Sequence, residues 1–254
     1  MSGADPLERW LGASGDGDFK ACCAQLYETE AARLLLGDDL HPGGAALTLR
    51  LAALAGVGPG QRVLDVASGR GTTARLLGEQ LGAEVVGVEL GEAAVLAARR
   101  EADRAGLSER VDFLTGDAES LPLPEQSFDH VFCECSLCTF PDKSRALAEM
   151  ARVLRPGGTV AIADVTADRT ALPDELGGAM ARVACVADAL SEDEYGSLLR
   201  EAGFAVLEVE RHADALAAMT ERVSARLRVA RMLALSGPDG DAARAAVRLA
   251  GLAR

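Results

Sequence analysis

The chain has 254 residues, of which 49% are hydrophobic and 4% aromatic. The hydrophobic fraction excludes extensive disorder, and the length suits one large α/β domain or two small ones. With 26 basic against 39 acidic residues, the formal net charge is −13. That balance argues against a nucleic-acid-binding or membrane-surface protein, because neutralising phosphate groups requires a basic surface.

The first residues show no basic start followed by an apolar run, so the sequence predicts no signal peptide. Charged residues and glycines interrupt every apolar stretch before the roughly 18 residues that a membrane helix needs. We therefore expect a cytoplasmic protein with no membrane partner. The six cysteines are too sparse for a disulfide scaffold, so their clustering indicates metal, metalloid or redox chemistry.

The first part of the chain has helical hydrophobic spacing over residues 19–36 and 45–55. The loop between them contains His41, Pro42, Gly43 and Gly44. We expect residues 1–57 to form a helical N-terminal segment ahead of the sheet.

Residues 58–213 alternate short apolar strands with helical segments. The strands are expected at 62–66, 84–90, 111–115, 128–135, 159–165 and 204–209. The helices between them are expected at 72–81, 92–106, 144–154 and 191–201. This order predicts an α/β fold in which a doubly wound, mostly parallel sheet is covered by helices on both faces. The ligand of such a sheet binds at the C-terminal ends of the strands.

Residues 214–254 are expected to form a helical tail that breaks at 236–240. No convincing seventh strand follows residue 209. Either residues 229–235 form this strand, or the sheet has six strands.

A small-residue loop joins the first strand to the following helix. Ala67, Gly69 and Gly71 would let a ligand approach the backbone, and the helix beyond offers unpaired N–H groups. The same loop also fits an ordinary tight turn, so alone it carries little information.

Three acidic residues lie at or just after the ends of successive strands: Asp65, Glu89 and Asp117. A carboxylate at Asp65 suits a cationic ammonium group better than a pyrophosphate. Glu89, about 20 residues further on, is placed to bind both ribose hydroxyls. Asp117 can accept a hydrogen bond from an exocyclic amine. A ligand with an amino acid end, a ribose and an adenine would satisfy all three.

These positions resemble the class I methyltransferases that use S-adenosylmethionine. The similarity covers residues 62–210 and includes Leu121-Pro-Leu-Pro, Ser127-Phe-Asp and Arg152-Val-Leu-Arg-Pro-Gly-Gly. It implies a Rossmann-like methyltransferase fold and S-adenosylmethionine as the cofactor. The implied cofactor-binding residues are Asp65, Ala67, Gly69, Gly71, Glu89, Leu90, Asp117, Ala118 and Cys133. The chain departs from the family pattern by an alanine in place of the first glycine and by Arg70. A Rossmann dehydrogenase, the alternative, would need a full G-x-G-x-x-G spacing that is missing.

Cys133, Cys135 and Cys138 cluster at the end of the fourth strand, which faces the transferred methyl group in this fold. Cys133 and Cys135 are two residues apart, so both are expected on one face of the strand. Burial as a small apolar residue is the ordinary alternative for each free cysteine.

The Cys-Glu-Cys sequence, Cys185 and the segment 191–204 also resemble arsenite methyltransferases. That resemblance implies that Cys133 or Cys135, together with Cys185, holds trivalent arsenic, with Cys22 and Cys23 standing for the N-terminal cysteines of that family. A trivalent metalloid prefers thiolates, and its lone pair needs no general base. The segments 41–44 and 138–143 depart from this second family.

The remaining candidates for acceptor binding are Tyr27, His41 and Cys138. In the methyltransferase fold, N-terminal helices cover the substrate, so the resemblance implies that residues 1–57 form a lid. For Tyr27, packing within this lid fits the sequence as well as a place in the pocket does. His130 is expected inside the sheet and His212 on the surface, while Asp164 would either face the substrate or cap a turn.

The sequence thus predicts an S-adenosylmethionine-dependent methyltransferase acting on a small molecule or a metalloid such as arsenite. Two alternatives remain: a C-, O- or S-methyltransferase with incidental cysteines, and a non-enzymatic protein that binds metal through Cys133, Cys135 and Cys138. Zinc sites usually show two C-x-x-C pairs, which the sequence lacks. We expect no resident metal, no nucleic-acid partner, and a monomer or homodimer.

Overall fold

The computed structural model describes residues 20, 34, 37, 41–168 and 189–236. Five strands form one parallel sheet in the order β3-β2-β1-β4-β5. Their bounds are β1 Arg62–Val66, β2 Glu84–Glu89, β3 Val111–Thr115, β4 Phe128–Glu134 and β5 Leu154–Ala163. The order reverses beside β1, between β2 and β4, so the ends of these central strands form the natural ligand site.

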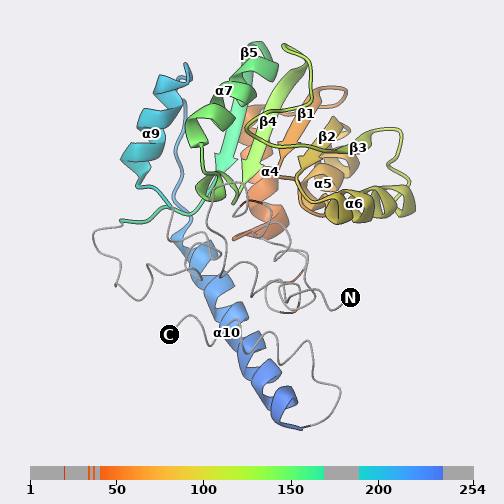
Figure 1. Cartoon of the computed structure of the whole chain (residues 1–254), viewed down its shortest axis with the longest axis vertical. Helices are drawn as coiled ribbons and strands as arrows, with labels where there is room; N and C mark the ends of the chain where they lie inside the picture. The colour runs from red at the N-terminus through yellow and green to blue at the C-terminus, as the bar shows by residue number, and fades with distance from the viewer. Residues whose placement is uncertain (1–19, 21–33, 35–36, 38–40, 169–188, 237–254) are drawn as a thin grey trace, which may run out of the picture.

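Helices cover both faces of this sheet (Figure 1). The helices are α4 Gly44–Ala55, α5 Thr72–Leu81, α6 Glu92–Arg104, α7 Lys143–Val153, α9 Glu192–Glu201 and α10 Ala213–Ser236, with a short 3-10 turn, η1, at Leu137–Thr139. Side chains of α4, α5 and α6 share one buried cluster, whereas those of α7 and α9 share another. The doubly wound parallel fold expected from the sequence is thereby confirmed.

Successive side chains of the central strands enter opposite clusters, as the two-residue period of a strand requires. In β1, Val63 packs with α4, α5 and α6, whereas Leu64 packs with α7. In β4, Phe132 joins the first of these clusters and Cys133 the second. This alternation decides which residue at the end of β4 reaches the ligand site.

Helix α9 begins as its sequence predicts. The hydroxyl of Ser191 accepts a hydrogen bond from the backbone N–H of Glu194, and the Glu194 carboxylate accepts one from the N–H of Ser191. This reciprocal pairing satisfies two of the donors that a helix start otherwise leaves free.

Three expectations about the sheet are wrong or incomplete. Residues 204–209 form no strand, and Leu207 is 81% exposed, because no neighbouring strand pairs with this segment. Residues 229–235 lie within α10 and are not a disguised strand. The fifth strand begins at Leu154, which pairs with Phe128 ahead of an irregularity in the register, rather than at residue 159.

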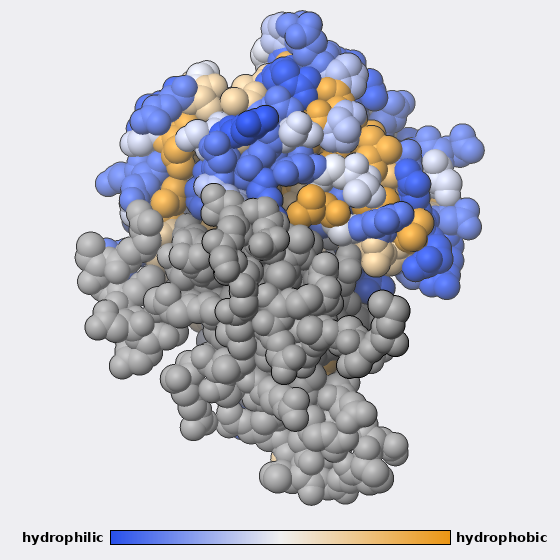
Figure 2. Space-filling model, in the orientation of Figure 1, coloured by the Kyte–Doolittle hydropathy of each residue, from blue (hydrophilic) through white to orange (hydrophobic). Residues whose placement is uncertain are grey.

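The long helix α10 extends away from the sheet (Figure 1). The visible face of the described part is mostly hydrophilic, with smaller hydrophobic patches between (Figure 2). None of the described helices is both long and apolar enough to cross a membrane.

Candidate active site

A cavity of about 360 Å³ lies at the C-terminal ends of β1, β2, β3 and β4. Small-molecule sites in proteins commonly have volumes of about 300–1,000 Å³. The predicted cofactor residues that line the cavity are Asp65, Ala67, Gly69, Glu89, Leu90, Asp117 and Ala118. Gly71 and Cys133, also predicted to bind the cofactor, are not among its lining residues.

Asp65 presents a buried carboxylate to the cavity. It is 2% exposed, and its Oδ2 has no hydrogen-bond partner among the described residues. Burial, together with the nearby charge of Glu134, raises the pKa of Asp65 well above its usual value. A buried carboxylate of this kind is suited to a cationic ligand, which would remove the cost of burying an uncompensated charge.

Glu89 holds the small-residue loop in place. Its Oε2 accepts a hydrogen bond from the N–H of Gly69 at 2.9 Å, and its Oε1 accepts one from the N–H of Gly91 at 2.9 Å. Each carboxylate oxygen has a further lone pair for a ligand hydroxyl.

The backbone at Ala67 has a conformation that suits glycine better than alanine. Its φ of 57° lies in the left-handed region, which costs a residue with a side chain about 1–2 kcal/mol. Gly71 directly precedes α5 and has a φ of 75°. A Cβ at that position would overlap the ring of Phe113. Gly71 therefore shapes the loop without lining the cavity.

Asp117 follows β3 and is paired with a cation from the N-terminal part. The ammonium of Lys20 lies 2.9 Å from Asp117 Oδ2 and 2.6 Å from Glu119 Oε2. Burial opposes ionisation of Asp117, but Lys20 and the N–H of Glu119 donate to it and lower its pKa below the usual value. Asp117 thus remains an ionised acceptor at the cavity edge.

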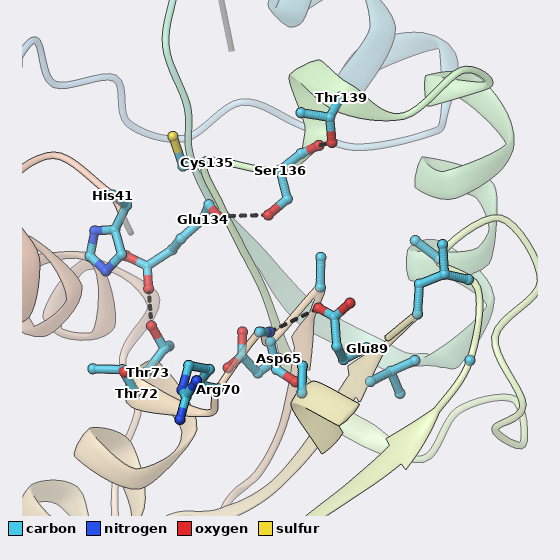
Figure 3. A pocket seen from close by; sticks show the side chains of 18 of the residues that line it. His41, Asp65, Arg70, Thr72, Thr73, Glu89, Glu134, Cys135, Ser136 and Thr139 are labelled. Atoms are coloured by element: carbon cyan, nitrogen blue, oxygen red, sulfur yellow. Dashed lines mark hydrogen bonds between the residues drawn. The ribbon is translucent and has the colours of Figure 1, made fainter. Parts of the chain in front are cut away.

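Glu134 is the most informative residue that the sequence interpretation left unassigned. It ends β4, is 9% exposed and lines the cavity. The hydroxyl of Thr73 donates to its Oε2 at 2.6 Å, and the hydroxyl of Thr48 donates to its Oε1 at 3.0 Å. Figure 3 shows its carboxylate beside the His41 ring and above Thr73. The sequence signal for Glu134 is a charged residue at the end of an otherwise apolar strand, as it is for Asp65 and Glu89.

The three clustered cysteines do not share one surface, contrary to the expected common face of Cys133 and Cys135. Cys133 is fully buried in the cluster under α7, and burial raises the pKa of its thiol well above the usual value. Cys138 is also fully buried. Only Cys135 of the three lines the cavity. It follows the end of β4 with a φ of 52°, and this left-handed turn breaks the strand's alternation.

The histidines lie where the sequence suggested. His41 lines the cavity, and its Nε2 is 3.5 Å from the Thr48 hydroxyl. His130 is buried in the sheet between Thr159 and Gln61, and burial lowers its pKa. His212 is exposed beside Glu210.

Asp164 follows β5 and caps the turn after β4. Its carboxylate accepts a hydrogen bond from the N–H of Cys138 at 2.8 Å. It is not among the residues that line the cavity.

Cys22, Cys23, Tyr27 and Cys185 lie outside the described residues, so their predicted roles stay predictions. Within the described part of the chain, no group of three or more His, Cys, Asp or Glu side chains is arranged to hold a metal ion. The three cysteines near β4 therefore do not form the thiolate set that the metal-binding alternative requires. Lining residues that the sequence interpretation missed include Lys20, Arg70, Thr73, Arg100 and Glu134.

Comparison with known proteins agrees with this geometry. A family model described as a methyltransferase domain matches residues 64–162. Methyltransferase GfsG of Streptomyces halstedii is 35% identical over 176 residues, which cover 68% of this chain and 63% of GfsG. An arsenite methyltransferase of Halobacterium salinarum is 34% identical over 214 residues, covering 78% of this chain and 52% of that protein. The 27-O-demethylrifamycin SV methyltransferase of Amycolatopsis mediterranei is 34% identical over 190 residues, covering 66% and 67%.

The chain therefore belongs to the class I S-adenosylmethionine-dependent methyltransferases. It spans between about half and two thirds of the length of these relatives. Among solved structures, the [4+2]-cyclase SpnF superposes with a TM-score of 0.75 at 24% identity, covering 92% of this chain and 88% of SpnF. That likeness concerns the fold alone, because one fold carries many reactions.

Proposed function

We propose that this protein transfers a methyl group from S-adenosylmethionine to a small-molecule acceptor that binds at the β4 end of the cavity. One observation carries the proposal: acidic residues from β1, β2 and the loop after β3 line a single cavity whose remaining wall holds His41, Glu134 and Cys135. The first group suits an amino acid, a ribose and an adenine. Within the second group, His41 and Cys135 are left for the acceptor.

The residues present fit the cofactor. The unpartnered, buried Oδ2 of Asp65 suits the ammonium group, and the free lone pairs of Glu89 suit the ribose hydroxyls. Asp117 remains ionised and suits the adenine amine. When bound, S-adenosylmethionine supplies a methyl group activated by a positively charged sulfur.

Residues at the β4 end would position the acceptor. Ser136 and Thr139 line this end of the cavity, with their hydroxyls donating to the backbone carbonyls of Glu134 and Ser136, and His41 lies on one side of it (Figure 3). Holding a nucleophile in line with the methyl group supplies most of what this displacement needs. For an oxygen or nitrogen acceptor, His41 is the group placed to take its proton.

The segment before residue 58 contributes to this site. Lys20 and His41 both line the cavity. Their positions support our proposal that residues 1–57 act as a lid, that residues 58–213 form the cofactor-binding domain and that residues 214–254 form a tail.

Transfer of a radioactive methyl group tests the proposal. The protein is incubated with S-adenosylmethionine labelled in its methyl group and an extract of its source organism that contains small molecules, protein and RNA. We expect label in the fraction below about 1 kDa, since the cavity volume matches small ligands. His41→Gln should lower this transfer, and His212→Gln serves as the exposed control. Label only in protein or RNA would contradict the proposal.

A metalloid acceptor is the second candidate, because Cys135 lines the cavity and the Halobacterium relative is an arsenite methyltransferase. Its test is methylation of sodium arsenite by the wild type, Cys135→Ser and Cys133→Ser. Methylated arsenic that disappears with Cys135→Ser would support it. Unchanged methylation in Cys135→Ser, or none in the wild type, would exclude it.

A further inference from the structure

Four carboxylates at the ligand edge follow the order of the strands. Asp117 follows β3, Glu89 ends β2, Asp65 lies in β1 and Glu134 ends β4, and these strands are neighbours in the sheet. The first three have a partner group on the cofactor: the adenine amine, the ribose hydroxyls and the ammonium. Glu134, beyond them toward the acceptor, has none assigned.

The structure fixes Glu134 through neutral groups. Among the described residues, the two hydrogen-bond donors to its side chain are hydroxyls, that of Thr48 from α4 and that of Thr73 from α5. No Lys or Arg in the described part of the chain forms an ion pair with Glu134 or with the neighbouring Asp65. Burying a carboxylate without a counter-charge costs free energy, so two such groups side by side mark a place prepared for positive charge.

A bound cofactor would bring two positive centres, the ammonium and the sulfonium. One buried carboxylate, Asp65, suits the ammonium, which leaves Glu134, at the β4 end of the same cavity, for the sulfonium. The sulfonium is the centre whose charge the reaction changes. When the methyl group leaves, the electron pair of the broken C–S bond stays on sulfur, which becomes a neutral thioether, and the methyl carbon bonds to the acceptor.

We propose that Glu134 is the counter-charge for the sulfonium and makes the cavity prefer S-adenosylmethionine over S-adenosylhomocysteine. The carboxylate faces a positive sulfur before transfer and a neutral one afterwards. Its attraction therefore favours entry of the methyl donor and release of the spent product. The inference rests on the cofactor assignment and not on which acceptor is used.

Titration calorimetry with three cofactor-site ligands tests this role without any acceptor. Sinefungin carries an ammonium in place of the methyl sulfonium, whereas S-adenosylhomocysteine is neutral there. We expect the wild type to bind S-adenosylmethionine and sinefungin at least ~10-fold more tightly than S-adenosylhomocysteine, as a close charge pair in a partly buried site allows. Equal affinities, or a preference for S-adenosylhomocysteine, in the wild type would overturn the proposal whatever any variant does.

Glu134→Gln keeps the shape and removes the charge. It should weaken both cationic ligands by ~10-fold and leave S-adenosylhomocysteine within ~2-fold of the wild type. Glu134→Asp keeps the charge and should retain the preference. Glu84→Gln, at an exposed glutamate at the start of β2, is the matched control. A Gln variant that weakens all three ligands equally would show a merely structural role and contradict the proposal.

The same titrations separate this inference from the methyl-transfer proposal. Binding of all three ligands with no charge preference would overturn the role of Glu134 alone. Failure of the wild type to bind any of them would remove both.

Discussion

The hydroxyl of Thr73 donates to the Glu134 carboxylate at 2.6 Å, joining the start of α5 to the end of β4. The two residues are 61 positions apart in the chain and are both buried. Through this bond, the helix that follows the small-residue loop is linked to the strand at whose end we propose that the acceptor binds.

Thr73→Val should destabilise the protein by about 1.5–3 kcal/mol, the range for removing a buried hydrogen bond to a charged group. Thr73→Ser keeps the hydroxyl and should lose less than about 1 kcal/mol. Urea unfolding of both variants measures the difference. Equal unfolding midpoints for Val and wild type would show that this bond contributes nothing.

Gly71→Ala should be far more damaging than Gly157→Ala, although both glycines have positive φ, 75° and 81°. At Gly157 a Cβ would meet nothing within 4 Å, so only the backbone cost of about 1–2 kcal/mol applies. At Gly71 the same cost adds to overlap with Phe113, which typically brings a further 1–3 kcal/mol, or roughly 2–5 in total. Thermal unfolding in parallel tests the ranking. Similar losses in the two variants would contradict the steric account.

Asp65→Asn should stabilise the cofactor-free protein at neutral pH, while weakening binding of S-adenosylmethionine. Burial and Glu134 raise the Asp65 pKa in the folded state, so the folded state holds the proton more tightly than the unfolded state. Wild-type stability is therefore lost as pH rises through this raised pKa. The stability difference between Asn variant and wild type should grow over the same range.

Melting temperatures of both proteins from pH 4 to pH 8 measure this linkage. A stability difference that stays constant with pH, or that favours the wild type at high pH, would contradict the assignment of Asp65 as an uncompensated buried carboxylate.

Cys135 should react with N-ethylmaleimide at least ~10-fold faster than Cys133 or Cys138. It lines the cavity, whereas the other two are fully buried and the Cys133 thiol has a raised pKa. Peptide mapping by mass spectrometry after timed exposure gives the three rates, and prior addition of S-adenosylhomocysteine should slow Cys135 selectively. Faster labelling of Cys133 than of Cys135 would contradict the assignment of Cys135 as the thiol that lines the cavity.

The sheet and the acidic lining of the cavity were largely predictable because they depend on local patterns. Alternating apolar runs identify β1 to β4, and the acidic residues Asp65 and Glu89 stand out at the strand ends. The expected strand at 204–209 does not form. Its apolar residues have strand propensity, but a strand also needs a neighbouring strand to pair with. Propensity is local, and pairing is a property of the whole sheet.

The acceptor end was harder to predict. A strand that continued through residue 135 would place Cys133 and Cys135 on the same face. The backbone turns left-handed at Cys135, and a sequence seldom reveals such a turn at a residue other than glycine. Glu134 was overlooked between two cysteines, although strand alternation places it opposite Cys133. Lys20 was unpredictable, since its ion pair with Asp117 spans 97 positions.

Calorimetric titration of the wild type and Glu89→Ala with S-adenosylmethionine tests the central claim most directly. Removing the Glu89 carboxylate takes away the proposed ribose partner and releases the N–H groups of Gly69 and Gly91. We expect saturable binding of one cofactor per chain in the wild type and affinity at least ~10-fold lower in the variant. No binding to the wild type, or equal affinity in Glu89→Ala, would contradict the account.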